Sequence, residues 1–208
     1  ARCEAREKVL RERLKSPFRT LRDVVLARVL SGRELRVKCV IGHSAVVDKD
    51  VLASAGSASL PYPCSFEFVR SSMSDARALS KSITDAAAYG EPDCIAVVRG
   101  GGDMEGVFDS PGLAATAASC KTPVYCALGH AVDSPFFERV VDGAFTTPTE
   151  FGAELRAAVS AAVAKRDGES AELRIANENK LAAMREEMEK KAEESGKRFL
   201  EAVERMEK

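Results

Sequence analysis

Two short stretches of the sequence place reactive side chains directly after apolar runs. The first, VVRGGGDMEGVFDS, covers residues 97–110 and contains an arginine followed by three glycines. The second, CALGHAVD, covers residues 126–133 and contains a histidine followed three residues later by an aspartate. The chain has only 2 histidines, and one of them lies in the second stretch. The two stretches are therefore its main candidates for chemistry.

Arg99 and the three glycines after it, Gly100, Gly101 and Gly102, have the composition of an anion-binding turn. Glycines let the backbone approach a ligand and turn several N–H groups toward one point, and a neighbouring arginine adds a bidentate phosphate contact. A tight turn without a ligand has the same composition, so both interpretations stay open. The spacing matches neither a dinucleotide fingerprint nor a Walker motif.

His130 and Asp133 have the spacing of a general acid or base and the carboxylate that orients it. One turn of helix would bring both side chains to the same side, and a carboxylate stabilises the charged imidazole. A capping aspartate and a loop histidine are the alternative. His43 also follows an apolar run and a glycine, and is a second candidate histidine.

Acidic residues after the glycines offer ligand atoms for a cation. Asp103, Glu105 and Asp109 are the candidates. A solvated loop that ends in a helix N-cap would have the same composition, and the spacing alone does not favour a metal.

The elements that must position these residues alternate along the chain. A helical pattern over residues 4–30 is interrupted at Pro17. Strands are expected at residues 35–41 and 64–70, in the run ending at the three glycines, and in residues 122–130; helices are expected at residues 47–56, 74–90 and 110–121.

This alternation predicts an α/β fold: a parallel sheet with helices on both faces, Rossmann-like, followed by a long coiled-coil helix. Ligands of such sheets bind beyond the carboxyl ends of the strands. Arg99, His130 and His43 each follow such an end. We therefore expect the two stretches to face one crevice.

Composition divides the chain into three parts: a basic helical segment at residues 1–34, an α/β catalytic domain at 35–152 and a coiled-coil arm at 153–208. Residues 1–36 hold eleven Lys or Arg against five Asp or Glu, although the whole chain has a net charge of -1. Such a segment attracts phosphates or forms a solvated helix face.

The predicted arm is rich in Ala, Glu, Lys and Arg. An interrupted apolar stripe along it indicates a helix that needs a partner along one seam. The stripe consists of Leu181, Met184, Met188, Ser195, Phe199, Ala202 and Met206.

The composition of 45% hydrophobic and 30% charged residues is typical of a globular protein. The 6 cysteines form no C-x-x-C pair and show no zinc spacing, which suits a reducing compartment. No secretory signal or membrane span is recognisable. We expect a cytoplasmic location, or an organelle if a targeting segment has been removed.

Three motifs in order resemble the large subunit of bacterial exodeoxyribonuclease VII. VVRGGGDMEGVF corresponds to the family's R-G-G-G-S-x-E-D-L, and PVYCALGHAVD to P-V-[IV]-x-A-[VI]-G-H-E-x-D. DGAFTTPTEFGAE corresponds to D-x-[RV]-A-x-T-P-[ST]-x-A-A-E, which opens a long helix. The resemblance covers residues 93–155 most closely and residues 35–90 more loosely.

The resemblance implies an exonuclease that degrades single-stranded DNA to short oligonucleotides, requires no cofactor and allows an optional Mg²⁺. It assigns functional roles to Arg99, His130 and Asp133, and through a gapped match to Asp75. It also implies that the long helix binds a small helical subunit. From the apolar stripe, a second copy of the chain is a further expected partner, in place of the subunit or beside it.

The chain departs from the family pattern at two corners. IGHSAVVD replaces T-S-x-T-G-A-A after the first strand, and DMEG replaces S-x-E-D after the glycines, so that one acid is missing. A nucleotide- or nucleic-acid-binding module that has lost catalysis is therefore an alternative, as is a coiled-coil scaffold.

Overall fold

The computed structural model describes residues 2–43, 46–100, 106–129 and 134–206, with only the backbone described at residues 197–206. It separates into an α/β unit, residues 1–164, and a C-terminal unit, residues 165–208. The helices are α1 Arg2–Arg13, α2 Leu21–Leu30, α3 Val47–Ala55, α4 Ala76–Ala88, α5 Pro111–Ser119 and α6 Pro148–Met206, with short 3-10 helices η1 Ser57–Ser59, η2 Val107–Asp109 and η3 Phe136–Arg139. The strands are β1 Leu35–Gly42, β2 Cys64–Ser71, β3 Cys94–Val98, β4 Val124–Ala127 and β5 Gly143–Phe145.

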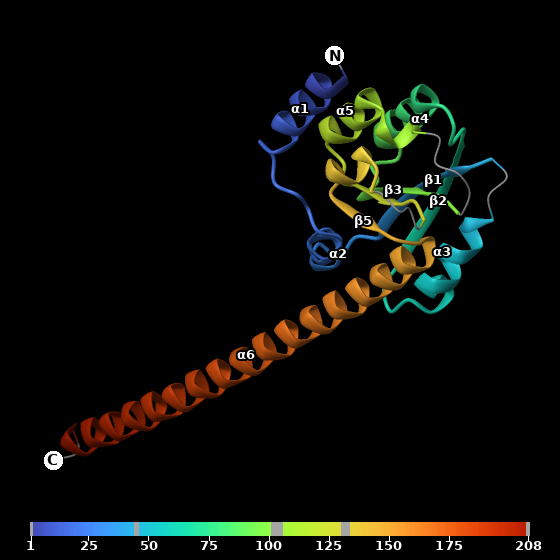
Figure 1. Cartoon of the computed structure of the whole chain (residues 1–208). Coiled ribbons are helices and arrows are strands. Elements are labelled where there is room, and N and C mark those ends of the chain that lie inside the picture. Colours follow the sequence, from blue (N-terminus) through green and yellow to red (C-terminus); the bar gives the residue numbers. More distant parts are fainter. Residues whose placement is uncertain (1, 44–45, 101–105, 130–133, 207–208) are drawn as a thin grey trace. The chain divides into compact units, whose positions relative to one another are not determined.

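The described strands form one parallel sheet in the order β2-β1-β3-β4-β5 (Figure 1). The expected strands and helices before residue 128 are confirmed to within a few residues. The strand β5 was not expected, because a segment of three residues shows no periodicity.

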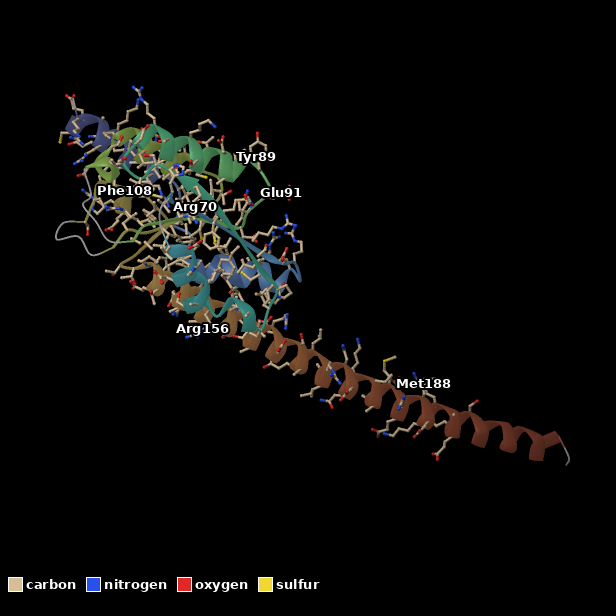
Figure 2. All side chains as sticks on the ribbon, turned by 90° about the vertical axis from the view of Figure 1, so that its right-hand side faces the viewer. Arg70, Tyr89, Glu91, Phe108, Arg156 and Met188 are labelled. Atoms are coloured by element: carbon tan, nitrogen blue, oxygen red, sulfur yellow. The ribbon has the colours of Figure 1, made fainter. Side chains whose placement is uncertain are left out.

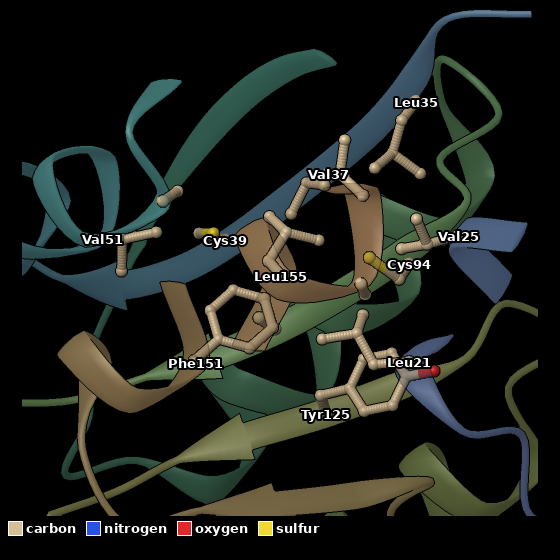
Figure 3. Packing of buried hydrophobic residues seen from close by; sticks show 14 of the residues in the cluster. Leu21, Val25, Leu35, Val37, Cys39, Val51, Cys94, Tyr125, Phe151 and Leu155 are labelled. Atoms are coloured by element: carbon tan, nitrogen blue, oxygen red, sulfur yellow. The ribbon is translucent and has the colours of Figure 1, made fainter. Parts of the chain in front are cut away.

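Residues of β3 point alternately to two hydrophobic layers. Cys94, Ala96 and Val98 join a cluster with α2, α3 and the first turns of α6 (Figure 3). Ile95 and Val97 join a cluster with α4 and α5. The two layers cover opposite faces of the sheet, which confirms the expected α/β fold with helices on both faces.

Local sequence signals set several helix ends. Gly56 ends α3 in the left-handed conformation, φ 62°, which glycine adopts without strain. The hydroxyl of Ser110 caps α5 at the N–H of Leu113. Before α6, the Thr147 hydroxyl accepts the N–H of Glu150 at 3.0 Å, and the Glu150 carboxylate accepts the N–H of Thr146 at 2.6 Å. These two capping bonds start α6 at Pro148, before the change in composition at Ala153.

The C-terminal unit consists of α6 from residue 165 onward. Side chains from residue 167 to residue 196 are exposed, and Met188 projects from the helix (Figure 2). Large apolar side chains are among them: Leu173, Ile175, Leu181, Met184 and Met188. The long helix is therefore confirmed, whereas its coiled-coil pairing stays a prediction. Among the described helices, none combines the length and the apolar character needed to cross a bilayer.

Candidate functional site

The strand order has a topological switch point between β1 and β3. The chain leaves β1 toward the face covered by α3 and leaves β3 toward the opposite face, covered by α5. The two connections diverge at the carboxyl edge of the sheet. In sheets of this strand order, ligands bind in the crevice at this point.

Arg99 and Gly100 lie at this edge, directly after β3, and both are half-buried. The N–H of Arg99 donates to the carbonyl of Ala127 in β4 at 2.8 Å. A Cβ on Gly100 would lie 3.1 Å from Cγ1 of Val47, the first residue of α3, so this position has little room for a side chain. The backbone after Arg99 is thus held between β4 and α3.

The segment after β4 approaches the same place. Gly129 has φ +93°, and a Cβ built on it would lie 3.9 Å from the carbonyl oxygen of Gly100. Gly129, the last described residue before position 130, is therefore adjacent to Gly100, the last described residue before position 101. The two stretches leave neighbouring strands at one edge of the sheet.

Six of the predicted site residues lie outside the described residues: Gly101, Gly102, Asp103, Glu105, His130 and Asp133. The expectation that Arg99 and His130 line one crevice stays a prediction.

His43 is exposed in the turn after β1. Arg70 of β2 donates from Nη1 to the carbonyls of Gly42 at 3.1 Å and His43 at 3.2 Å (Figure 2). Its Nη2 lies 3.1 Å from Oδ2 of Asp48 in α3. The arginine thus ties the end of β1 to α3, the helix whose first residue, Val47, lies next to Gly100. This contact lies in the corner where the sequence departs from the family motif.

Asp75 is the N-cap of α4 and follows β2. Its Oδ1 accepts the N–H groups of Arg77 at 2.8 Å and Ala78 at 3.3 Å. Asp75 therefore caps the helix that was expected at residues 74–90. A catalytic role for the same carboxylate stays a prediction.

Asp109, which sequence analysis considered as a cation ligand, forms an ion pair with Arg6. Its Oδ1 lies 2.9 Å from Nη2 of Arg6 in α1. Within the part of the chain that the structure describes, no group of three or more His, Cys, Asp or Glu side chains is arranged to hold a metal ion.

The basic N-terminal segment contains buried and partly buried ion pairs that sequence analysis missed. Arg13 and Asp142 pair at 2.9 Å, and Asp142 also accepts the N–H of Arg19 at 2.9 Å. Arg28 pairs with Asp93 at 2.7 Å. Several of these cations therefore join elements of the fold. Sequence analysis had considered only phosphate attraction and a solvated helix face for this segment. The only sequence signal was the position of Asp142 at the start of the third motif.

Buried thiols of the sheet do not act as nucleophiles at neutral pH. Burial raises the pKa of Cys39 and of Cys64 to about 12. It also raises the pKa of Cys94 and Cys126 well above the ordinary value. The thiolate is the reactive form. Cys39, Cys94 and Cys126 are core residues, and Cys64 is partly buried.

The chain is similar to one family of known proteins. The family model described as "Exonuclease VII, large subunit" matches residues 72–208. The exodeoxyribonuclease 7 large subunit of Streptomyces griseus is 33% identical over 120 residues, covering 55% of this chain and 29% of that protein. The protein of the same name from Clavibacter michiganensis is 34% identical over 117 residues, covering 53% of this chain and 26% of the relative. The chain thus spans less than a third of the length of these relatives.

Proposed function

The chain belongs to the exonuclease VII large-subunit family, since the family model matches residues 72–208, and on this premise we propose that it is the catalytic part of an exodeoxyribonuclease. The substrate is single-stranded DNA, which is hydrolysed to short oligonucleotides. The observation that carries this proposal is the approach of Gly129 to Gly100 at the carboxyl edge of β3 and β4.

The proposed mechanism divides binding and proton transfer between the two stretches. Arg99 and the backbone N–H groups of residues 100–102 bind the phosphate and stabilise its developing charge. His130 acts as the general acid or base, and Asp133 steadies it. Asp75 orients the attacking water or a bound cation; Mg²⁺ is optional in this scheme.

The proposed assembly uses the apolar side of α6. Apolar side chains at helical spacing, such as Met184 and Met188, fit a small helical subunit or a second copy of the chain. A cytoplasmic nuclease that works in DNA repair fits this composition and family. The departures at DMEG and IGHSAVVD favour a second candidate: a nucleic-acid-binding module without catalysis.

A cleavage assay on the full-length protein and its co-purified partner separates the two candidates. End-labelled single-stranded DNA is incubated with and without chelator, beside His130→Ala. The proposal expects short products from the native protein, and a loss of about 10²–10⁴-fold in the variant. Binding without cleavage by the native protein would support the binding module. Loss of cleavage in His43→Ala but not in His130→Ala would move the general acid or base to the β1–α3 turn.

A further inference from the structure

Helix α1 contacts the end of the arginine stretch and the chain just beyond the histidine stretch. Arg6 and Arg13 are seven residues apart, about two helical turns, so they share one face of α1. The guanidinium of Arg6 lies 5.1 Å from the ring centre of Phe136 in η3, and Nε of Arg13 donates to the carbonyl of Val140 at 2.6 Å. The helix therefore holds both ends of η3.

Asp109 joins this helix to two further segments. It is the last residue of η2, which follows the glycine stretch, and Phe136 is the first residue of η3, which follows the histidine stretch. Its Oδ1 accepts the N–H of Phe136 at 3.1 Å and lies 2.9 Å from Nη2 of Arg6. Its carbonyl also accepts from Arg6, at 2.8 Å. One carboxylate oxygen thus links η2, η3 and α1.

The two segments are joined at both ends. At the sheet edge, Arg99 bonds to Ala127 and Gly129 approaches Gly100. At the far ends, besides the link through Asp109, the rings of Phe108 and Phe137 lie 5.8 Å apart. Residues 99–109 and 127–137 therefore have fixed separations at their beginnings and at their ends.

We propose that Asp109 and Arg6 form a positioning pair, which sets the relative placement of these two segments for the proposed phosphodiester hydrolysis. This role rests on the proposed function and acts through Arg99 and His130. The pair contributes little to global stability, because its side chains are 33% and 40% exposed. Its loss should shift Tm by no more than about 2–4 °C in a protein of this size.

The test compares Asp109→Ala, Arg6→Ala and the double variant in the full-length protein with its co-purified partner. Arg11→Ala is the matched control, because Arg11 lies on the same helix in an exposed pair with Glu7. Misplaced reacting groups reduce turnover by about 10–100-fold. We expect this loss at saturating single-stranded DNA in Asp109→Ala, with the Kd for DNA within about twofold of the native value.

Rescue and non-additivity distinguish positioning from a general loss of structure. Asp109→Asn keeps an oxygen that can accept from Phe136 and should recover part of the turnover. The double variant should be no slower than Asp109→Ala, because the two residues act as a unit. Native turnover in Asp109→Ala, or losses that multiply in the double variant, would overturn the proposal.

Hydrogen exchange tests the pair without reference to cleavage. Amide exchange in residues 134–141 should accelerate in Asp109→Ala and stay native in Arg11→Ala. Unchanged exchange in Asp109→Ala would overturn the link between the segments. Absence of DNA cleavage by the native protein would instead contradict the proposed function, and exchange would still decide whether the pair holds η3.

Discussion

Nη2 of Arg13 lies 2.9 Å from Oδ1 of Asp142, and both side chains are only 4% exposed. The carboxylate also accepts the N–H of Val124, the first residue of β4, at 2.9 Å. The N-terminal helical segment is thus tied to the amino end of the sheet, opposite the edge that carries Arg99. The buried pair belongs to the framework of the fold and not to the candidate site.

Replacing Asp142 with alanine should lower the free energy of unfolding by about 3–5 kcal/mol, because it leaves the Arg13 guanidinium buried without its counter-charge. Urea unfolding measures this change. Asp85→Ala is the control, since Asp85 forms an exposed pair with Lys81 and its loss should change stability by less than about 0.5 kcal/mol. Equal effects of the two substitutions would contradict a structural role for the buried pair.

The sequence predicted elements whose signals are local. Gly56, Asp75 and Ser110 each mark a helix end within a few residues of the apolar pattern of that helix. The partner of Asp142 was not predictable, because Arg13 lies 129 residues away and composition does not reveal which charges pair. The same holds for Arg6 and Asp109, which are 103 residues apart.

Gly152→Ala should destabilise the α/β unit, because α6 passes close to α3 at this position. A Cβ on Gly152 would lie 2.7 Å from the carbonyl oxygen of Val51 and 3.0 Å from the N atom of Ala55. We expect a loss of about 1–3 kcal/mol in urea unfolding, as for other overpacked sites.

Gly168→Ala is the matched control for this substitution, because a Cβ there meets no atom within 4 Å. Alanine should strengthen this helical position by up to about 1 kcal/mol, measured as helicity by circular dichroism. The same substitution is therefore expected to lower stability at position 152 and to raise it at position 168 of one helix. An unchanged free energy of unfolding in Gly152→Ala would mean that α3 and α6 separate easily.

Stability should fall between pH 9 and 12, and Cys39 should contribute to this fall. Burial raises the pKa of its thiol from 9.0 to about 12, so the unfolded state loses the proton first and binds fewer protons in this window. From pH 8 to pH 10, Cys39→Ala should lose about 1.4 kcal/mol less stability than the native chain. Cys3→Ala is the control, because Cys3 is exposed. Identical pH slopes in the native chain and Cys39→Ala, measured by urea unfolding, would contradict this assignment.

Arg99→Lys should reduce cleavage of single-stranded DNA by about 10²-fold or more, because an ammonium group cannot reproduce a planar bidentate donor at a phosphate. The initial rate of release of short products measures the loss. Arg36→Lys is the control, since Arg36 lies near the amino end of β1, beside Glu34. Native rates in Arg99→Lys would reduce Arg99 to a structural role.

The position of Arg99 was predictable, whereas its surroundings were not. An apolar run that ends in glycines fixes a strand end locally. The neighbours of Gly100 come from α3 and from the segment after β4, which only the strand order brings together. Asp75 shows the converse case: its capping contacts follow from adjacent sequence, but these contacts carry no information about chemistry.

The last prediction concerns the C-terminal unit. Leu181, Met184 and Met188 are 51%, 52% and 70% exposed and lie on one side of α6. A single helix gains most of its stability from packing, so we expect this side to bind partner helices, either of a second copy or of a small helical subunit. Met184→Glu with Met188→Glu should release the partner and leave the α/β unit folded. Size-exclusion chromatography with light scattering measures the mass of the complex.

Asn179→Glu with Ala183→Glu adds the same charge away from the apolar side, because at about 100° per residue Asn179 lies about 170° and Ala183 about 130° from the middle of that side. This control should keep the native mass. If both double variants dissociated, charge rather than the apolar side would govern assembly. A native full-length protein that runs as a monomer with every candidate partner would contradict the prediction altogether.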